Sequence, residues 1–384
     1  MKFKILMALH VVCALCALYI LSFVVSDMVF SNAAEASVAE IVEEVEEVYE
    51  PEEDLTGWAI NSLTGLLIDE EAAMRRPALV VIDNAVTALP HSGIARADII
   101  YEVLAEGSIT RLIAVFRDFD VEKIGPVRSA RHYFPLFALD NDAVFVHHGG
   151  SELAYSAISN LRLNNLDGMT DAQTFFRDPE RARVARLYEH SSYTSGQRIL
   201  DAIARRGLRG NVSEDFVNMF NFYETVTTPQ TPDPRAEIIH AHSVSFPFSA
   251  SYVSTFEFDF AKGAYRKYFA GEPHIDAETN EQLVFTNIIV QYAGMRVIDG
   301  VGRREVTLVG EGTGFLITNG VAVPIRWSKA NNQSPTVWMD EAGNPLRLNR
   351  GTTYIGVFDR NHSVNIEFSW PRFPRQGPQQ QQLP

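Results

Sequence analysis

The first half of the chain alternates short hydrophobic runs with polar turns, a pattern that predicts a sheet. Ala78–Ile82 (ALVVI) has the length of a buried strand and ends at the polar pair Asp83–Asn84. Two β-rich runs, Ile99–Glu106 and Ile109–Phe116, are separated only by Gly107–Ser108, which predicts a tight hairpin. Asp83 and Asn84 stand where ligand sites of α/β proteins often lie, or they form an Asx-type turn that leaves the strand.

The two-residue loop also predicts the register of this hairpin. Leu104 then faces Arg111 and Glu102 faces Ile113, so Arg111 lies diagonally between Glu102 and Glu106, about 7–8 Å from each. The two glutamates are then roughly 13 Å apart along one strand. A glycosidase pair needs a separation of about 5–10 Å. The glutamates are therefore excluded as an acid–base couple, which leaves an arginine neutralised by its neighbours.

Turn and capping residues predict helices beside this sheet. A helix that begins near Ser129 and runs to about Leu139 follows the Gly125–Pro126 turn and places Arg128 and Arg131 on one face. Further along the chain, Ser195 is a good N-cap for a helix over Gly196–Arg206, which ends at Gly207.

One strand-to-helix junction has the features of an anion-binding site. The predicted strand Ala143–Val146 is followed by the run His147-His148-Gly149-Gly150, and Ser151 caps a helix that runs to about Leu161. Glycines next to a helix N-terminus form a cradle for anions. Adjacent strand residues point to opposite faces, so at most one of the two histidines serves such a site, and a two-histidine metal site is not expected.

The second half of the chain has a different pattern. Residues 208–236 are rich in Asn, Thr and Pro and predict a connecting segment, and from Glu237 on the runs are strand-like and separated by turns. The GEGTG run at Gly310–Gly314 lacks a following helix, so it is rejected as a nucleotide fingerprint. The fold class expected is α+β, with an N-terminal α/β domain built on a mixed sheet and a β-rich antiparallel C-terminal domain.

The ends of the chain predict a membrane attachment. Ile5–Val25 is long enough to span a bilayer as a helix, and Lys2 and Lys4 place the rest of the chain outside the cytoplasm. Cleavage of this segment near Ala36 is the alternative. The predicted organisation is therefore residues 1–36 as signal-anchor or signal peptide, 37–60 as acidic linker, 61–207 as first domain, 208–236 as connection, 237–370 as second domain and 371–384 as disordered tail.

Charge and cysteine content exclude several functions. The 384 residues carry a formal net charge of −15, to which the spacer 37–54 contributes nine acids and no base. An acidic surface repels phosphate backbones, so nucleic acid is not an expected partner. Cys13 and Cys16 both lie in the apolar leader, so the rest of the chain has no disulfide, thiolate nucleophile or cysteine zinc site. No cofactor and no metal are expected.

Four motifs of the first domain are distinctive: RPALVVIDN at Arg76–Asn84, SGIARADIIYEVLAEGSITR at Ser92–Arg111, IGPVRSAR at Ile124–Arg131 and VHHGG at Val146–Gly150. Together they resemble the YerB family, bacterial envelope proteins built on the domains of unknown function called DUF3048. The resemblance spans about Asn61 to Phe358 and implies two domains and an extracytoplasmic place. Many relatives resemble lipoproteins, whereas this chain lacks a convincing lipobox. The resemblance implies no established chemistry and no catalytic residue.

Three functions remain open for the charged residues of the first domain. The first is binding of an anionic envelope component, such as a cell-wall glycan. The second is an envelope hydrolase or transferase in which His147 or His190 acts with Asp83 and the arginines. The third is a scaffold for envelope proteins. Candidate ligand-binding residues are Arg111, Arg128, Arg131, His147, Gly149, Gly150, Ser151, Arg177 and Tyr193.

Overall fold

A computed structural model describes residues 55–229, 239–360 and 367–369. The predicted membrane segment 1–36, most of the acidic linker and the tail 371–384 lie outside these residues. No helix in the described part of the chain is long and apolar enough to cross a membrane. The described residues from Gly57 onward form one structural unit.

The helices of the described chain are short. They are α2 (Glu70–Met74), α3 (Phe134–Asp140), α4 (Glu152–Asn160), α5 (Pro179–Ala182) and α6 (Gly196–Arg205), with 3-10 turns η1 (Val86–Ala88), η2 (Ile94–Arg96) and η3 (Ala185–His190). The predicted caps are confirmed, since the hydroxyls of Ser151 and Ser195 accept hydrogen bonds from the first turns of α4 and α6.

Strands dominate both halves of the chain. The first half contains β1 (Trp58–Ile60), β2 (Leu67–Asp69), β3 (Ala78–Asp83), β4 (Ile99–Glu106), β5 (Ile109–Phe116), β6 (Val144–His147), β7 (Asn165–Asp167), β8 (Phe176–Arg177), β9 (Ser192–Tyr193) and β10 (Asn221–Phe222). The second half contains β11 (Ile239–His240), β12 (Ser243–Ser249), β13 (Tyr252–Asp259), β14 (Ala264–Phe269), β15 (Glu272–Pro273), β16 (Val284–Phe285), β17 (Asn287–Val297), β18 (Arg304–Thr307), β19 (Gly310–Thr318), β20 (Val321–Lys329), β21 (Val337–Asp340), β22 (Arg347–Leu348), β23 (Thr353–Asp359) and β24 (Glu367–Ser369).

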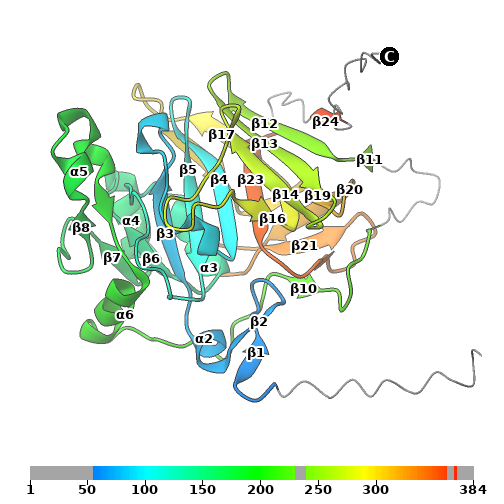
Figure 1. Ribbon diagram of the computed structural model, residues 1–384, viewed down its shortest axis with the longest axis horizontal. Coiled ribbons are helices and arrows are strands. Elements are labelled where there is room, and N and C mark those ends of the chain that lie inside the picture. The colour runs from blue at the N-terminus through cyan, green and yellow to red at the C-terminus, as the bar shows by residue number, and fades with distance from the viewer. Residues whose placement is uncertain (1–54, 230–238, 361–366, 370–384) are drawn as a thin grey trace, which may run out of the picture. The chain divides into compact units, whose positions relative to one another are not determined.

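Twelve of the described strands form one mixed sheet that crosses both halves of the chain (Figure 1). Its main path runs β11-β20-β19-β17-β23-β4-β5-β3-β6-β7. The halves meet where β23 pairs in parallel with β4, from Thr353 beside Ile99 to Val357 beside Val103. The expected β-rich α+β fold with a mixed sheet is observed, but the two predicted domains share this sheet instead of each forming its own.

A second sheet belongs to the second half alone. It is antiparallel along the path β15-β14-β13-β12-β24, with β16 beside β14. The antiparallel prediction therefore holds for this region. Figure 1 shows the helices α4, α5 and α6 near the β6–β7 end of the mixed sheet.

The hydrophobic run of β3 is buried on both faces. Val80 and Ile82 belong to one hydrophobic cluster, whereas Leu79 and Val81 belong to another on the opposite face. Such two-sided burial explains why the run lacks polar alternation. The polar residue that ends the strand, Asp83, is therefore carried into the interior of the protein.

The hairpin was predicted correctly, but its register was wrong. Glu106 faces Ile109 as expected, but a bulge between Leu104 and Glu106 shifts the remaining pairs, so that Arg111 faces Val103. An extra residue on one strand changes which side chains share a face. Glu102 and Glu106 therefore do not flank Arg111: Glu106 contacts it, and Glu102 bonds to a different set of residues.

The helix predicted from Ser129 begins later, at Phe134. The preceding segment is extended because its main chain pairs with its neighbours: the Arg128 amide donates to the Val81 carbonyl, and the Ala130 amide donates to the Gly149 carbonyl. Pro135 then occupies the first turn of α3, where its missing N–H costs nothing. Arg128 and Arg131 consequently do not share a helix face.

A buried polar cluster lies at the seam between the two halves. The Glu102 carboxylate accepts hydrogen bonds from Thr110 (2.9 Å), Ser254 (2.8 Å) and Tyr354 (2.7 Å). Its ion-pair partner is Lys267, 3.6 Å away, and both side chains are fully buried. We call Glu102, Ser254, Lys267 and Tyr354 the seam cluster. Because three of its four members come from the second half, it ties that half to β4.

Two histidines extend the seam cluster toward Asp83. Lys267 Nζ lies 3.2 Å from His274 Nδ1, His274 Nε2 lies 2.8 Å from His91 Nδ1, and His91 Nε2 lies 2.7 Å from the Asp83 carbonyl oxygen. A carbonyl can only accept, so His91 donates through Nε2 and accepts at Nδ1 from His274. Every donor then has an acceptor with both histidines neutral. Burial lowers the pKa of His91 to about 4 and that of His274 well below 6.5.

These two histidines predict a loss of stability in mild acid. The unfolded chain binds protons on them below about pH 6.5, while the folded protein keeps them neutral, so stability is lost as the pH falls from 6.5 toward 4. At about pH 5 the loss from His91 alone is on the order of 2 kcal/mol, and His274 acts in the same direction. Asp98 offsets part of this loss. Burial raises its pKa in the folded protein to about 6, so the folded protein takes up this proton more readily than the unfolded chain and gains stability as the pH falls.

Urea unfolding at pH values between about 5 and 7 measures this effect. The His91→Gln/His274→Gln variant should show a clearly shallower pH dependence than the native protein. Equal slopes for the two proteins would mean that other groups cause the acid sensitivity.

Candidate functional site

Asp83 is the centre of a buried ionic cluster at the end of β3. Its carboxylate lies 2.7 Å from His190 Nδ1, 3.5 Å from Arg111 Nη1 and 3.3 Å from Arg128 Nε. Burial alone would raise the pKa of Asp83, but the His190 hydrogen bond and the two arginine charges hold it well below its usual range. Asp83 is therefore a permanent anion. It also makes the predicted Asx-type contact, to the Ala85 amide at 3.1 Å.

The His190 ring joins Asp83 to an exposed hydroxyl. Its Nδ1 faces the carboxylate, and its Nε2 lies 2.9 Å from Thr87 Oγ1 in η1. Arg181 holds the loop that follows Thr87 by donating to the carbonyls of Leu89 and Pro90. The arrangement of hydroxyl, imidazole and carboxylate is one that can activate a nucleophile. The sequence analysis selected Asp83 and His190. It missed Thr87, because this residue belongs to no recognisable sequence motif.

Two predicted ligand-binding arginines are occupied by internal carboxylates. Arg111 is 2% exposed and, besides Asp83, contacts Glu106 at 3.1 Å. Arg131 is also buried and forms an ion pair with the other oxygen of Glu106. Arg111 and Arg131 therefore neutralise acids inside the protein and do not reach an open pocket.

The predicted anion cradle already holds an anion, the carboxylate of Asp167. Its Oδ1 accepts from the amides of Gly149 (2.8 Å) and Met169 (3.0 Å), and its Oδ2 accepts from the Tyr155 hydroxyl (3.0 Å). Asp167 reaches the junction because β7 runs parallel to β6 and ends beside it. The Gly149 amide, which the sequence analysis placed in an anion cradle, therefore already donates to a carboxylate of the protein itself.

The remaining cradle residues make internal contacts. His147 has no exposed surface; its Nδ1 lies 2.8 Å from the Gly149 carbonyl and its Nε2 lies 3.3 Å from Asn165 Oδ1. Gly150 bridges to Ala130, and Ser151 caps α4. His147 Nδ1 also lies 3.8 Å from Asp167 Oδ1, but the ring has no exposed surface, whereas His190 contacts both the Asp83 carboxylate and the Thr87 hydroxyl.

His148, the neighbour of His147, lines a small pocket of about 200 Å³ beside the ionic cluster. The polar residues around it are Arg128, His148, Arg177, Tyr188, Glu189 and Ser192. Arg128 reaches down to Asp83 and also pairs with Glu189 at 2.7 Å. Two of the predicted ligand-binding residues, Arg128 and Arg177, therefore meet at one pocket. Tyr193, a third, is buried under Lys123 and does not line it.

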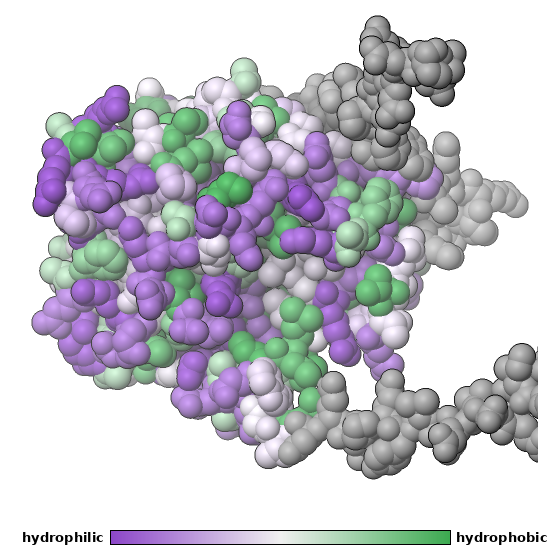
Figure 2. Space-filling view, in the orientation of Figure 1, coloured by the Kyte–Doolittle hydropathy of each residue, from purple (hydrophilic) through white to green (hydrophobic). Residues whose placement is uncertain are grey.

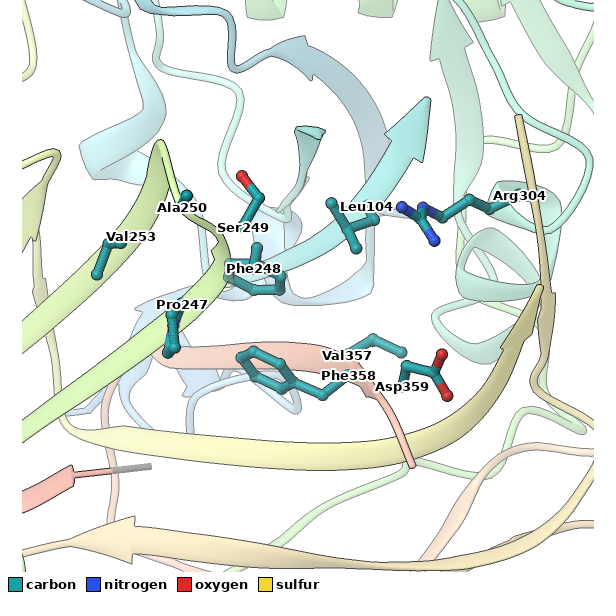
Figure 3. Close-up of a pocket in the computed structure, with 10 residues that line it drawn as sticks. All are labelled: Leu104, Pro247, Phe248, Ser249, Ala250, Val253, Arg304, Val357, Phe358 and Asp359. Atoms are coloured by element: carbon teal, nitrogen blue, oxygen red, sulfur yellow. The ribbon is translucent and has the colours of Figure 1, made fainter. Parts of the chain in front are cut away.

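A larger cavity, of about 540 Å³, lies between the two sheets (Figure 3). Most of its wall is apolar, from Leu104, Pro247, Phe248, Val253, Val357 and Phe358. Ser249, Arg304 and Asp359 add polar groups. Sequence reasoning missed this cavity because its walls come from β4, β12, β13, β18 and β23, which only the tertiary structure brings together.

Two further observations bear on the three functions that the sequence left open. Figure 2 shows a largely hydrophilic face with separate hydrophobic patches. Exposed apolar side chains occur on the β1–β2 hairpin, where Trp58, Ile60 and Leu67 are 44–55% exposed. Among the described residues, no group of three or more His, Cys, Asp or Glu side chains is placed to hold a metal ion.

Comparisons with known proteins identify the family. Residues 63–209 match the DUF3048 N-terminal domain and residues 244–355 match the DUF3048 C-terminal domain, both described as protein of unknown function. "Putative lipoprotein YerB" of Bacillus subtilis (strain 168) is 30% identical over 298 residues, which cover 77% of this chain and 85% of that protein. The crystal structure of the YerB protein from Bacillus subtilis has a TM-score of 0.65 and 29% identity, covering 77% of this chain and 95% of that one. The chain belongs to the YerB family and contains both DUF3048 domains.

Proposed function

We propose that this protein is a membrane-tethered, extracytoplasmic protein that binds an anionic group of a cell-envelope molecule. The tether is supported by the apolar leader Ile5–Val25 with its two preceding lysines. The lipoprotein description of the Bacillus subtilis relative supports an envelope location by family membership. The anion site is the 200 Å³ pocket that Arg128, His148 and Arg177 line.

Arg177 carries the proposal, because its charge is not neutralised nearby. In the described chain no carboxylate lies within 4.0 Å of it, whereas Arg128 is paired with both Asp83 and Glu189. Arg177 Nη1 donates to the Tyr188 carbonyl (3.0 Å), and the guanidinium lies 4.6 Å from the centre of the Tyr188 ring. The guanidinium is therefore held in place and exposed, as a bidentate contact to phosphate or carboxylate requires.

His148 adds a neutral donor to the same pocket. Its Nδ1 lies 2.6 Å from the Ser192 hydroxyl. Burial and the charge of Arg177 lower the pKa of His148, so the ring is neutral at pH 7. When Ser192 donates to Nδ1, the ring proton is on Nε2, which is then free to donate to an anion.

The Arg177→Gln variant should bind an anionic probe about ten-fold or more weakly than the native protein, because a charge-assisted hydrogen bond is worth about 1.5–3 kcal/mol. Isothermal titration with glycerol phosphate measures this, and glycerol serves as the uncharged comparison. Binding should also weaken with added salt.

The control is Arg296→Gln, which removes an exposed arginine of β17 that does not line the pocket. It should bind glycerol phosphate as the native protein does. If Arg177→Gln and Arg296→Gln bind equally, or if glycerol binds as tightly as its phosphate, the pocket is not an anion site.

A second function, that of a hydrolase or transferase, is favoured by one observation: the contact of Thr87 with His190. In that function His190 Nε2 takes the proton of the attacking hydroxyl, and Asp83, held ionised by Arg111 and Arg128, orients the ring and stabilises its positive charge. An anionic substrate held by Arg177 would combine both functions at one site.

A fluorophosphonate tests the second function directly, since it phosphonylates activated hydroxyls. Mass spectrometry should find the adduct on Thr87 in the native protein and in Thr279→Val, which removes a partly exposed hydroxyl elsewhere. The adduct should be absent from Thr87→Val and from His190→Gln. An unlabelled native protein, or labelling that survives in His190→Gln, would remove Thr87 as a nucleophile.

A further inference from the structure

The 540 Å³ cavity is a site of a different kind from the anion pocket. It opens between β12–β13 of the antiparallel sheet and β4–β23 of the mixed sheet. Pockets of about 300–1,000 Å³ with mostly apolar walls are typical of small-molecule sites. The volume and the location between two sheets therefore favour a ligand that enters the sandwich with an apolar portion.

The inner wall is formed by stacked aromatic rings. Phe248 and Phe358 lie parallel, with ring centroids 4.4 Å apart and an interplanar angle of 15°. Leu104 and Val357 continue this wall from the neighbouring strands β4 and β23 (Figure 3). Such a surface offers dispersion contacts and no hydrogen bonds, so a hydrocarbon chain suits it better than a sugar or a peptide backbone.

The rim carries an unsatisfied cation. Arg304 Nη2 donates to the Gly107 carbonyl at 2.8 Å, but its Nε is buried and has no hydrogen-bond partner in the described chain. In Figure 3 the guanidinium extends toward Leu104 at one end of the cavity. Because the guanidinium lines the cavity and has no carboxylate partner within 4.0 Å in the described chain, an anionic group in the cavity would meet its positive charge. Asp359 also lines the cavity and lowers the net positive charge of its rim. A ligand head group with a single negative charge is therefore favoured.

We infer that this cavity binds a single-chain anionic amphiphile, with its hydrocarbon chain between the sheets and its carboxylate at Arg304. The inference rests on a different site from the proposed anion pocket, so each can fail without the other. A fatty acid has the required chemistry.

The experiment uses the full-length protein in lipid nanodiscs and a dodecanoate that carries a photoreactive diazirine on its chain. After irradiation, mass spectrometry should find adducts in the peptides that contain Leu104, Phe248 or Val357. Val253→Trp fills the cavity and should reduce this labelling about ten-fold or more, consistent with a loss of about 1.4 kcal/mol or more. Val337→Trp, an equally large change at an exposed strand position, should not reduce it.

The head group is tested with the matching diazirine alcohol. Arg304→Gln should reduce labelling by the acid and leave labelling by the alcohol unchanged, while Arg303→Gln, an arginine outside the cavity, should change neither. Equal labelling of Val253→Trp and Val337→Trp would overturn the site, as would adducts spread over the surface. Equal labelling of the native protein by the acid and by the alcohol would overturn the role of Arg304.

Discussion

The parallel pairing of β23 with β4 is the constraint on which the rest of the structure depends. It joins the second half of the chain to β4, the edge strand of the part of the sheet that the first half forms, so β4 has neighbours on both edges. Glu102 of β4 is thereby buried. Besides its bonds from Asn84 and Thr110 of the first half, it accepts hydrogen bonds from Ser254 and Tyr354 and pairs with Lys267, which all belong to the second half. A second buried ion pair, between Lys329 of the second half and Asp140 of the first at 2.6 Å, also ties the two halves together.

The same constraint decides which charged residues can face a ligand. The central strands β3, β4 and β5 are covered on both faces, so the charges at their ends are neutralised internally, as Arg111 is by Asp83 and Glu106. The polar side chains that a ligand can reach lie on segments that follow the sheet strands. They are Thr87 in η1, and Arg177 and His148 around the small pocket. The cavity between the sheets exists because two sheets from different parts of the chain pack together.

Local patterns in the sequence predicted local structure well. The buried strand at Ala78, the Gly107–Ser108 hairpin and the caps at Ser151 and Ser195 all depend on neighbouring residues and were found as expected. The bulge at Leu104–Glu106 and the late start of α3 depend on distant strands, so no local pattern revealed them. The site residues show the same limit. Asp83 and His190, two candidates of the hydrolase or transferase hypothesis, are in contact, but nothing in the sequence shows that Asp167 lies against the Gly149 amide or that two sheets enclose a cavity.

Native-state hydrogen exchange of a Lys267→Met protein tests most directly whether the seam cluster makes the two halves one folding unit. Removing one partner of a buried ion pair costs about 3–5 kcal/mol, because it leaves the other charge buried and unpaired. If the halves unfold together, the amides of β4 and β5 should lose protection as much as those of β17 and β23, while exposed Lys262→Met should change neither set. Loss of protection confined to strands of the second half would contradict the account.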